Sequence, residues 1–125
     1  MAETIFLAKA KRNIQAAQLL FDNQLYDESA NRAYYAAFQA ALAMLSDANI
    51  QVDRKSHKAV QANFNSAFIH KQKVFPSHVK SYLSDLHAVR IDADYKPLVI
   101  SKKVTMQQIR KAKEFVELID REIRK

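Results

Sequence analysis

Residues 29–48 have the sequence SANRAYYAAFQAALAMLSDA and are the most informative segment of the chain for its architecture. Their spacing predicts a helix that begins after Tyr26, with Asp27 accepting hydrogen bonds from the free amides of the first turn, and ends near residue 49. One face of this helix carries mostly alanine, at Ala30, Ala33, Ala37, Ala41, Met44 and Ala48. Because alanine lets a neighbouring helix approach the backbone closely, the segment is expected to be the central helix of a bundle.

The segments on either side of residues 29–48 also have helical spacing, and none sustains the two-residue alternation of a strand. The first predicted helix ends at the polar residues 22–24. Ser56 is a plausible cap for a third helix, in which apolar residues recur every four positions and which should end near His70. These patterns indicate an all-α protein.

Two further helices complete the prediction. Pro76 fits the start of the fourth, where its missing amide costs nothing, and Pro97 should end that helix at or before Lys96. Thr105 and Gln108 have the spacing of a capping box and predict the start of a strongly amphipathic fifth helix. With no linker long enough to divide the chain, residues 1–125 are expected to form a single domain of four or five helices.

The composition excludes several classes of protein. The 125 residues include 20 Lys or Arg and 13 Asp or Glu, a formal net charge of +7, and neither cysteine nor glycine. Zinc–thiolate sites, disulfides and cysteine nucleophiles are therefore excluded, as are glycine-rich phosphate loops. No segment has the length and hydropathy of a membrane span or a signal peptide, so we expect a soluble cytoplasmic protein without a membrane partner.

Positive charge is concentrated in residues 54–84, which contain six Lys or Arg, three histidines and no acidic residue. A solvated face would account for this basic sector. The alternative is a patch that attracts nucleic acid phosphates or an acidic partner.

Arg90 is out of place on the predicted fourth helix, because it projects from the apolar stripe. That stripe consists of Val79, Tyr82, Leu83, Leu86, Val89 and Ala93. His87 lies one turn before Arg90 and Asp94 one turn after it. A buried arginine needs a partner, so Arg90 either forms an internal ion pair with Asp94 or Asp92, or faces a cleft or subunit interface where it binds phosphate.

A second unusual surface is the face of the central helix opposite its alanine stripe, which carries Ser29, Arg32, Tyr35 and Gln39. A face of this polarity suits another helix, a second copy of the chain or an RNA backbone, although an ordinary surface face would look the same.

The four histidines have no metal-ligand spacing, so no metal site and no cofactor is expected. His70 and His78 flank a loop and are interpreted as solvated. His57 follows the predicted cap Ser56, where it either belongs to ordinary capping structure or meets an anion.

Three segments together resemble the HEPN domain family: residues 29–40 (SANRAYYAAFQA), 56–60 (SHKAV) and 90–95 (RIDADY). The resemblance extends over residues 5–123. It implies an up-and-down bundle of four to five helices that pairs as a homodimer, with the arginine helices of two subunits around a shared cleft. It also implies a prokaryotic toxin–antitoxin or defence context, often beside a small nucleotidyltransferase partner.

Many members of this family are metal-independent endoribonucleases with an arginine followed four to six residues later by histidine. Here Arg90 matches the arginine, but no histidine follows it, and the segment resembles an Arg-x-x-Ala-Asp-Tyr variant instead. This departure favours lost or weakened ribonuclease activity. The alternative is an active ribonuclease toxin whose candidate catalytic residues are Arg90, Asp94, Tyr95 and His57, with His87 as another possible substitute for the missing histidine.

For the binding interpretation, Arg32, Lys58 and Arg90 are the expected contacts to RNA or phosphate. Tyr35 and Gln39 are the expected interface residues, toward a second copy or a nucleotidyltransferase. Tyr95 is a candidate acceptor for a transferred nucleotide because it lies close to Arg90 in a family associated with such transferases.

Overall fold

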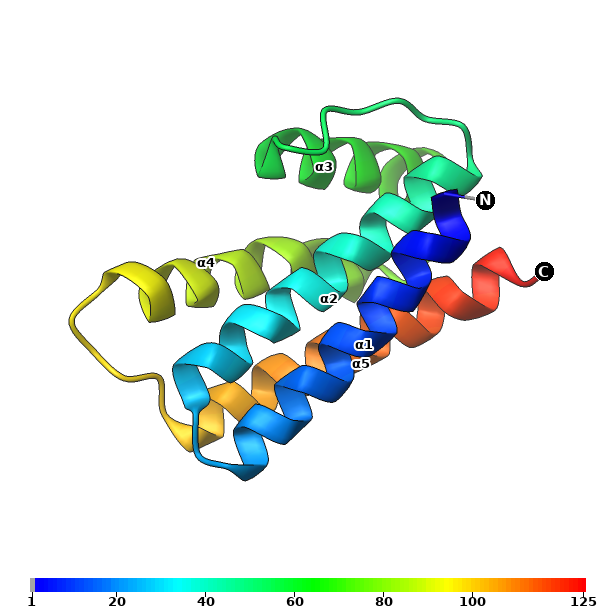
Figure 1. Ribbon diagram of the computed structural model, residues 1–125. Coiled ribbons are helices and arrows are strands. Elements are labelled where there is room, and N and C mark those ends of the chain that lie inside the picture. Colours follow the sequence, from blue (N-terminus) through cyan, green and yellow to red (C-terminus); the bar gives the residue numbers. More distant parts are fainter. Residues whose placement is uncertain (1) are drawn as a thin grey trace.

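The computed structural model describes residues 2–125, whose regular elements are all helical, as the sequence predicts (Figure 1). In chain order these are α1 (Ala2–Asp22), α2 (Tyr26–Asp47), α3 (His57–Phe64), the π-helical η1 (Asn65–Lys71), the 3₁₀-helical η2 (Ser77–Ser81), α4 (Tyr82–Tyr95) and α5 (Lys102–Ile123).

Helix α2 is the centre of the bundle and contacts α1, α3, α4 and α5. Helices α1 and α2 form an antiparallel hairpin, and α5 lies alongside both (Figure 1). The predicted alanine stripe is buried from Ala30 to Met44, whereas Ala48 is exposed beyond the end of the helix. The central position expected from the alanines is therefore confirmed.

Ser29 lies where α2 packs against α1, and another helix is one of the partners expected for the semi-polar face. The residue is fully buried, and its hydroxyl donates a hydrogen bond of 2.7 Å to the Ala17 carbonyl of α1. A small polar side chain is accommodated there because the bond satisfies the hydroxyl within the tight α1–α2 contact.

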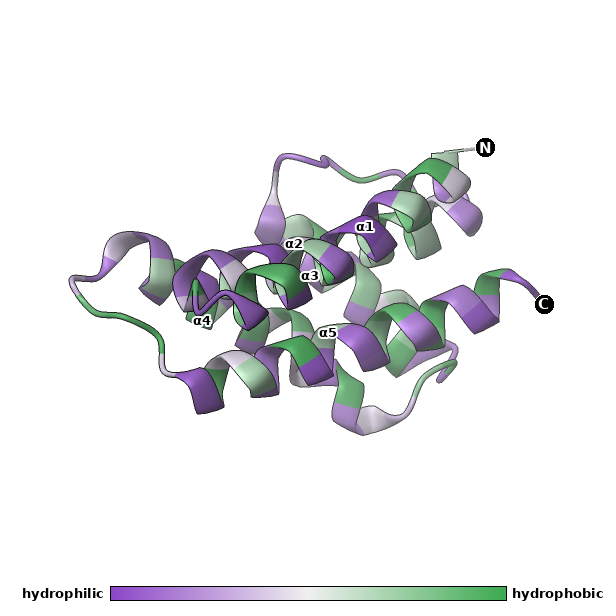
Figure 2. Ribbon diagram, turned by 60° about the horizontal axis from the view of Figure 1, so that its bottom comes forward, coloured by the Kyte–Doolittle hydropathy of each residue, from purple (hydrophilic) through white to green (hydrophobic). Residues whose placement is uncertain are grey.

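An aromatic cluster fills the space where α3 and η1 meet α5. The Phe64 ring lies 5.1 Å from Phe115 and 5.7 Å from Phe75, measured between centroids, and Phe64 and Phe115 are almost completely buried. Helix α5 presents an alternating pattern of hydrophobic and hydrophilic residues, as expected for a helix with one face on the core (Figure 2).

The ends of the third and fourth predicted helices are set by local chemistry. Ser56 caps α3, and its hydroxyl accepts a 3.0 Å bond from the Ala59 amide, as predicted. The chain stays helical to Lys71, but the last part is π-helical. Pro76 precedes a 3₁₀ turn rather than opening the α-helix directly, and Lys96 is extended before Pro97, which confirms the predicted end of α4.

Two predicted caps are wrong. Asp27 does not cap α2, which has no side-chain cap; its carboxylate instead accepts a 2.8 Å bond from the Ile100 amide and so fixes the α4–α5 connection to α2. Helix α5 begins at Lys102, capped by Ser101, whose hydroxyl accepts from the Val104 amide at 3.1 Å. Thr105 lies inside the helix, where its hydroxyl donates to the Ser101 carbonyl.

None of the helices within residues 2–125 combines the length and the hydropathy required to cross a membrane.

Replacing Ala37 with Leu tests the close packing of α2. Ala37 is completely buried, so the larger side chain should lower the free energy of unfolding by about 1–3 kcal/mol. Ala8→Leu on the exposed side of α1 is the matched control and should change it by less than about 0.5 kcal/mol. Urea denaturation measures both, and equal effects of the two substitutions would contradict the packing described here.

Candidate functional site

Arg90 is held on α4 by partners from two helices. Its side chain is 14% exposed, its Nε lies 2.9 Å from a carboxylate oxygen of Asp94, and its Nη2 donates a 3.0 Å hydrogen bond to the Tyr35 hydroxyl. The Arg90–Asp94 ion pair is thus formed, whereas Asp92 pairs with Lys96 at 3.0 Å. Helical spacing brings Asp94 one turn after Arg90, and the contact between α2 and α4 adds Tyr35.

Three tyrosine rings surround the Arg90 guanidinium. Its central carbon lies 5.3 Å from the Tyr35 ring centroid, 5.9 Å from Tyr34 and 6.0 Å from Tyr95. Aromatic faces stabilise a cation that has lost part of its hydration, and more so for arginine because of its planar group. Tyr34 is fully buried, whereas Tyr95 is 71% exposed at the end of α4.

Two imidazoles lie next to this cluster. The His57 ring, at the start of α3, stacks on the His87 ring of α4 with centroids 5.3 Å apart and planes at 26°. The Tyr34 hydroxyl forms a hydrogen bond with Nδ1 of His57. Because burial raises the pKa of Tyr34, its phenol stays protonated, and it either donates this bond to Nδ1 or accepts it from the Nδ1 proton, according to the tautomer of His57.

Both imidazoles favour the neutral form. Burial lowers the pKa of His57, and the positive charge of Arg90 lowers it further. The pKa of His87 is lowered by burial first, then by His57 and Arg90. Nδ1 of His87 is buried and has no hydrogen-bond partner among residues 2–125. The site therefore offers uncharged imidazole nitrogens beside a fixed guanidinium.

A chain of polar contacts connects Arg90 to α1. Asp94 accepts a 3.1 Å bond from the Asn31 side-chain amide, and the Asn31 Oδ1 accepts a 2.7 Å bond from Nη2 of Arg32. Nη1 of Arg32 donates to Oδ1 of Asn13 at 3.0 Å. Arg90 therefore pairs with a carboxylate, whereas the acceptors of Arg32 are neutral amides.

Sequence reasoning assigned no role to Asn31 or Asn13. Asn31 lies inside the segment that carries the family resemblance, between Ala30 and Arg32, and this was the only available signal for it. Asn13 reaches Arg32 across 19 residues of sequence, so nothing local indicated its role.

The structure does not bring every predicted residue into this cluster. Lys58 is exposed on α3 and makes no hydrogen bond or ion pair with another residue of 2–125. Gln39 is partly buried, and its Oε1 has no hydrogen-bond partner in the described chain. Tyr35, predicted as an interface residue, is engaged with Arg90.

His78 is exposed, as expected, but it also contacts a carboxylate. Its Nε2 lies 2.9 Å from Glu114 of α5, and the same carboxylate accepts a 2.7 Å bond from the Tyr82 hydroxyl. His78 and Tyr82 lower the pKa of Glu114, and burial with this contact raises the pKa of Tyr82 to about 12. His70 is exposed, as expected.

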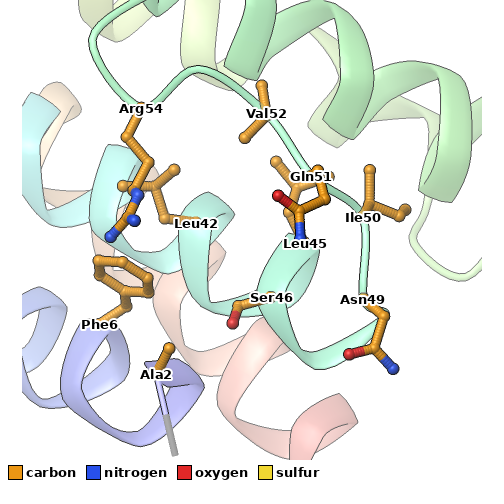
Figure 3. Close-up of a pocket in the computed structure, with 10 residues that line it drawn as sticks. All are labelled: Ala2, Phe6, Leu42, Leu45, Ser46, Asn49, Ile50, Gln51, Val52 and Arg54. Carbon is orange, nitrogen blue, oxygen red and sulfur yellow. The ribbon is translucent and has the colours of Figure 1, made fainter.

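A separate pocket of about 200 Å³ lies between the start of α1 and the end of α2 (Figure 3). Phe6, Leu42 and Leu45 contribute apolar surface to it. Arg54, from the basic sector, lies over the Phe6 ring at 5.6 Å. The pocket lies apart from Arg90, and none of the residues that contact Arg90 lines it.

Residues 2–125 contain no group of three or more His, Asp or Glu side chains arranged to hold a metal ion.

The three segments that suggested the family meet at the Arg90 cluster: residues 29–40 supply Asn31, Tyr34 and Tyr35, residues 56–60 supply His57, and residues 90–95 supply Arg90 and its ion-pair partner. The model of the HEPN domain matches residues 4–123. The chain belongs to the HEPN family. Its helical bundle is accordingly that of a HEPN domain.

Relatives of this HEPN domain occur in archaea and bacteria. It is 29% identical to the protein named "Putative toxin MJ0605" of Methanocaldococcus jannaschii. The alignment spans 115 residues, which are 92% of this chain and 84% of the relative. A "UPF0332 protein" of Thermotoga maritima is 30% identical over 90% of this chain and 84% of its own length. The "UPF0332 protein glr0978" of Gloeobacter violaceus is 33% identical over 70% of this chain and 67% of its own length.

The lowered pKa values of His57 and His87 predict that the HEPN domain loses stability in mild acid. As pH falls below about 6.5, the unfolded chain binds protons at both imidazoles while the folded protein does not, so the free energy of unfolding decreases. Urea denaturation between neutral pH and pH 5 measures this decrease.

The matched variants for this measurement are His57→Gln and His70→Gln. His57→Gln removes one of the responsible groups and should flatten the pH dependence, whereas the exposed His70→Gln should leave it unchanged. A His57→Gln profile with the same slope as the parent protein would contradict the assignment.

Proposed function

We propose that this HEPN protein is a toxin-like module that binds RNA through the phosphate groups at a basic cleft around Arg90. The observation that carries the proposal is that Arg90, paired with Asp94, lies beside Arg32, whose hydrogen bonds go only to neutral amides, while the neighbouring imidazoles favour the neutral form. Arg32 thus keeps its full positive charge next to the partly desolvated Arg90. A guanidinium in such a setting binds phosphate in a bidentate manner.

The names of two relatives, which call them putative toxins, support the toxin-like role. Exposed Lys58 on α3 is a further candidate contact for the phosphate backbone.

We further propose that two copies of the chain form the cleft. Large apolar side chains are exposed next to the site, with Tyr95, Leu98 and Val99 at 71%, 46% and 75%. They lie at the end of α4 and in the connection to α5, which appears as a hydrophobic strip in Figure 2. Contiguous exposed apolar residues beside a polar site are typical of a protein interface. A small nucleotidyltransferase partner would instead bind the face of α2 that carries Tyr35 and Gln39, and Tyr95 remains the candidate acceptor for a transferred nucleotide.

Replacing Arg90 with Ala tests the binding proposal. The affinity for a fluorescently labelled single-stranded RNA should fall by about 10-fold or more, because a charge-assisted contact is lost. The slope of log affinity against log salt concentration should fall by about 0.7. Arg90→Lys should preserve the slope but recover only part of the affinity, because lysine keeps the charge and loses the planar fork.

Arg110→Ala is the matched control, since Arg110 is exposed on α5 and its loss changes the net charge equally. It should bind RNA as the parent protein does. Sedimentation velocity on all variants reports whether the homodimer is kept. Equal binding by Arg90→Ala and the parent protein, at every salt concentration, would refute the proposed role of Arg90.

A second candidate function, metal-independent RNA cleavage, is favoured by the position of His57. If the Nδ1 proton of neutral His57 is donated to the Tyr34 hydroxyl, Nε2 is free to take the proton of a ribose 2′ hydroxyl. The 2′ oxygen then attacks phosphorus while the bond to the 5′ oxygen breaks, and that oxygen takes up a proton from water. The products are a 2′,3′-cyclic phosphate and a free 5′ hydroxyl. Arg90, paired with Asp94, would stabilise the charge that develops on the phosphate, and Tyr95 would flank it.

Incubation with RNA in the presence of EDTA tests this second function. If it holds, the parent protein cleaves RNA, and His57→Ala lowers the rate by about 10²–10⁴-fold whereas the exposed His70→Ala does not. Cleavage that persists in Arg90→Ala, or its absence from the parent protein, would leave RNA binding as the only function of the site.

A further inference from the structure

An open groove of about 300 Å³ lies on the side of Arg32 that faces α1. It is lined by Lys9, Arg12, Asn13, Ala16 and Arg32. Three of these five residues are basic and none is acidic. Sequence analysis located the basic sector in residues 54–84 and assigned no role to Lys9 or Arg12.

Arg32 keeps its full positive charge at this groove. Its hydrogen bonds go to the side-chain oxygens of Asn13 and Asn31, which are neutral. Asn13 in turn donates to the Lys9 carbonyl at 3.1 Å, which orients its oxygen toward Arg32. The two asparagines fix the guanidinium without neutralising it.

The other two cations of the groove are also uncompensated. Lys9 and Arg12 are exposed, and neither forms an ion pair with a carboxylate of residues 2–125. Lys11, between them in sequence, instead pairs with Asp120 of α5 at 3.3 Å. Helical geometry therefore separates a neutralised lysine on one face of α1 from two free cations on another.

The groove continues the Arg90 cluster. Arg32 and Arg90 both lie against the ring of Tyr35, with guanidinium carbons 5.0 and 5.3 Å from its centroid. Arg32 also lines a second groove, with Glu28 and Asp94, where acidic side chains disfavour an anion. A polyanion seated at Arg90 and Arg32 is thus repelled on the Glu28 side and attracted toward Lys9.

We propose that the groove of Lys9, Arg12 and Arg32 binds the phosphodiester backbone of the RNA strand whose neighbouring phosphate contacts Arg90. This inference rests on the proposed function and extends its site onto α1. A row of separate, exposed cations with no apolar anchor suits a flexible chain of phosphates, which binds by charge and releases counterions.

The test compares Lys9→Ala/Arg12→Ala with Lys102→Ala/Lys103→Ala, two double variants that lose the same charge. Lys102 and Lys103 are exposed at the start of α5 and outside the groove. Fluorescence anisotropy with a single-stranded oligoribonucleotide, over a series of salt concentrations, gives affinity and salt slope. The groove variant should lower the slope by about 1.4, two phosphate contacts at about 0.7 each, and the control should not.

Each outcome decides between the two proposals. If both double variants weaken binding equally, the groove contributes only net charge and the inference is wrong. If Arg90→Ala weakens RNA binding but Lys9→Ala/Arg12→Ala does not, the inference fails and the proposed function stands, leaving an acidic protein as the partner to test at the groove. If binding depends on Lys9 and Arg12 but not on Arg90, the groove is confirmed as an RNA site and the proposed role of Arg90 fails.

Discussion

The close contact of α2 with its neighbours determines where every other part of the molecule can lie. Alanine along one face lets α1 and α5 approach its backbone, and the Ser29 hydroxyl completes the α1–α2 contact by bonding to Ala17. The bulkier side chains Tyr34 and Tyr35 are thereby held against α4. Without this fixed spacing, Arg90 would have no hydroxyl to bond and no aromatic rings around it, and burying its charge would be unfavourable.

Electrostatics in the cluster follow from this packing. Asp94 pairs with Arg90, whereas Arg32 bonds the neutral amides of Asn13 and Asn31 and keeps its full positive charge. Burial and the positive charge of Arg90 also lower the pKa values of His57 and His87. Protonated histidines would add positive charge at the cluster, but neutral ones retain nitrogens that accept protons. The arrangement therefore places imidazoles beside a guanidinium, and it is a proton-transfer group that RNA cleavage requires in addition to the attraction of phosphate.

Local sequence rules predicted the features that depend on neighbouring residues. Each of these features depends on residues at most four positions apart in the sequence. They are the Ser56 cap of α3, the end of α4 before Pro97 and the i,i+4 ion pair of Arg90 with Asp94. The capping predictions failed where a side chain found a distant partner: the Asp27 carboxylate bonds an amide 73 residues away instead of capping α2. The contacts that build the site, such as Asn31 with Asp94, span 63 residues and depend on helix register, which periodicity alone does not specify.

No histidine follows Arg90 in the sequence, yet two imidazoles lie near Arg90 in the folded protein. The ribonuclease motif to which Arg90 corresponds places an imidazole a few residues further on, where this chain has Tyr95 and Pro97. Here the imidazoles come instead from the start of α3 and from one turn before Arg90, and they meet beside the same guanidinium. Catalytic arrangements are recognised by geometry rather than by sequence order, and unrelated orders can place the same groups together. Loss of the linear motif therefore does not remove an imidazole from the neighbourhood of Arg90, because the Tyr34 hydrogen bond holds the His57 ring in place.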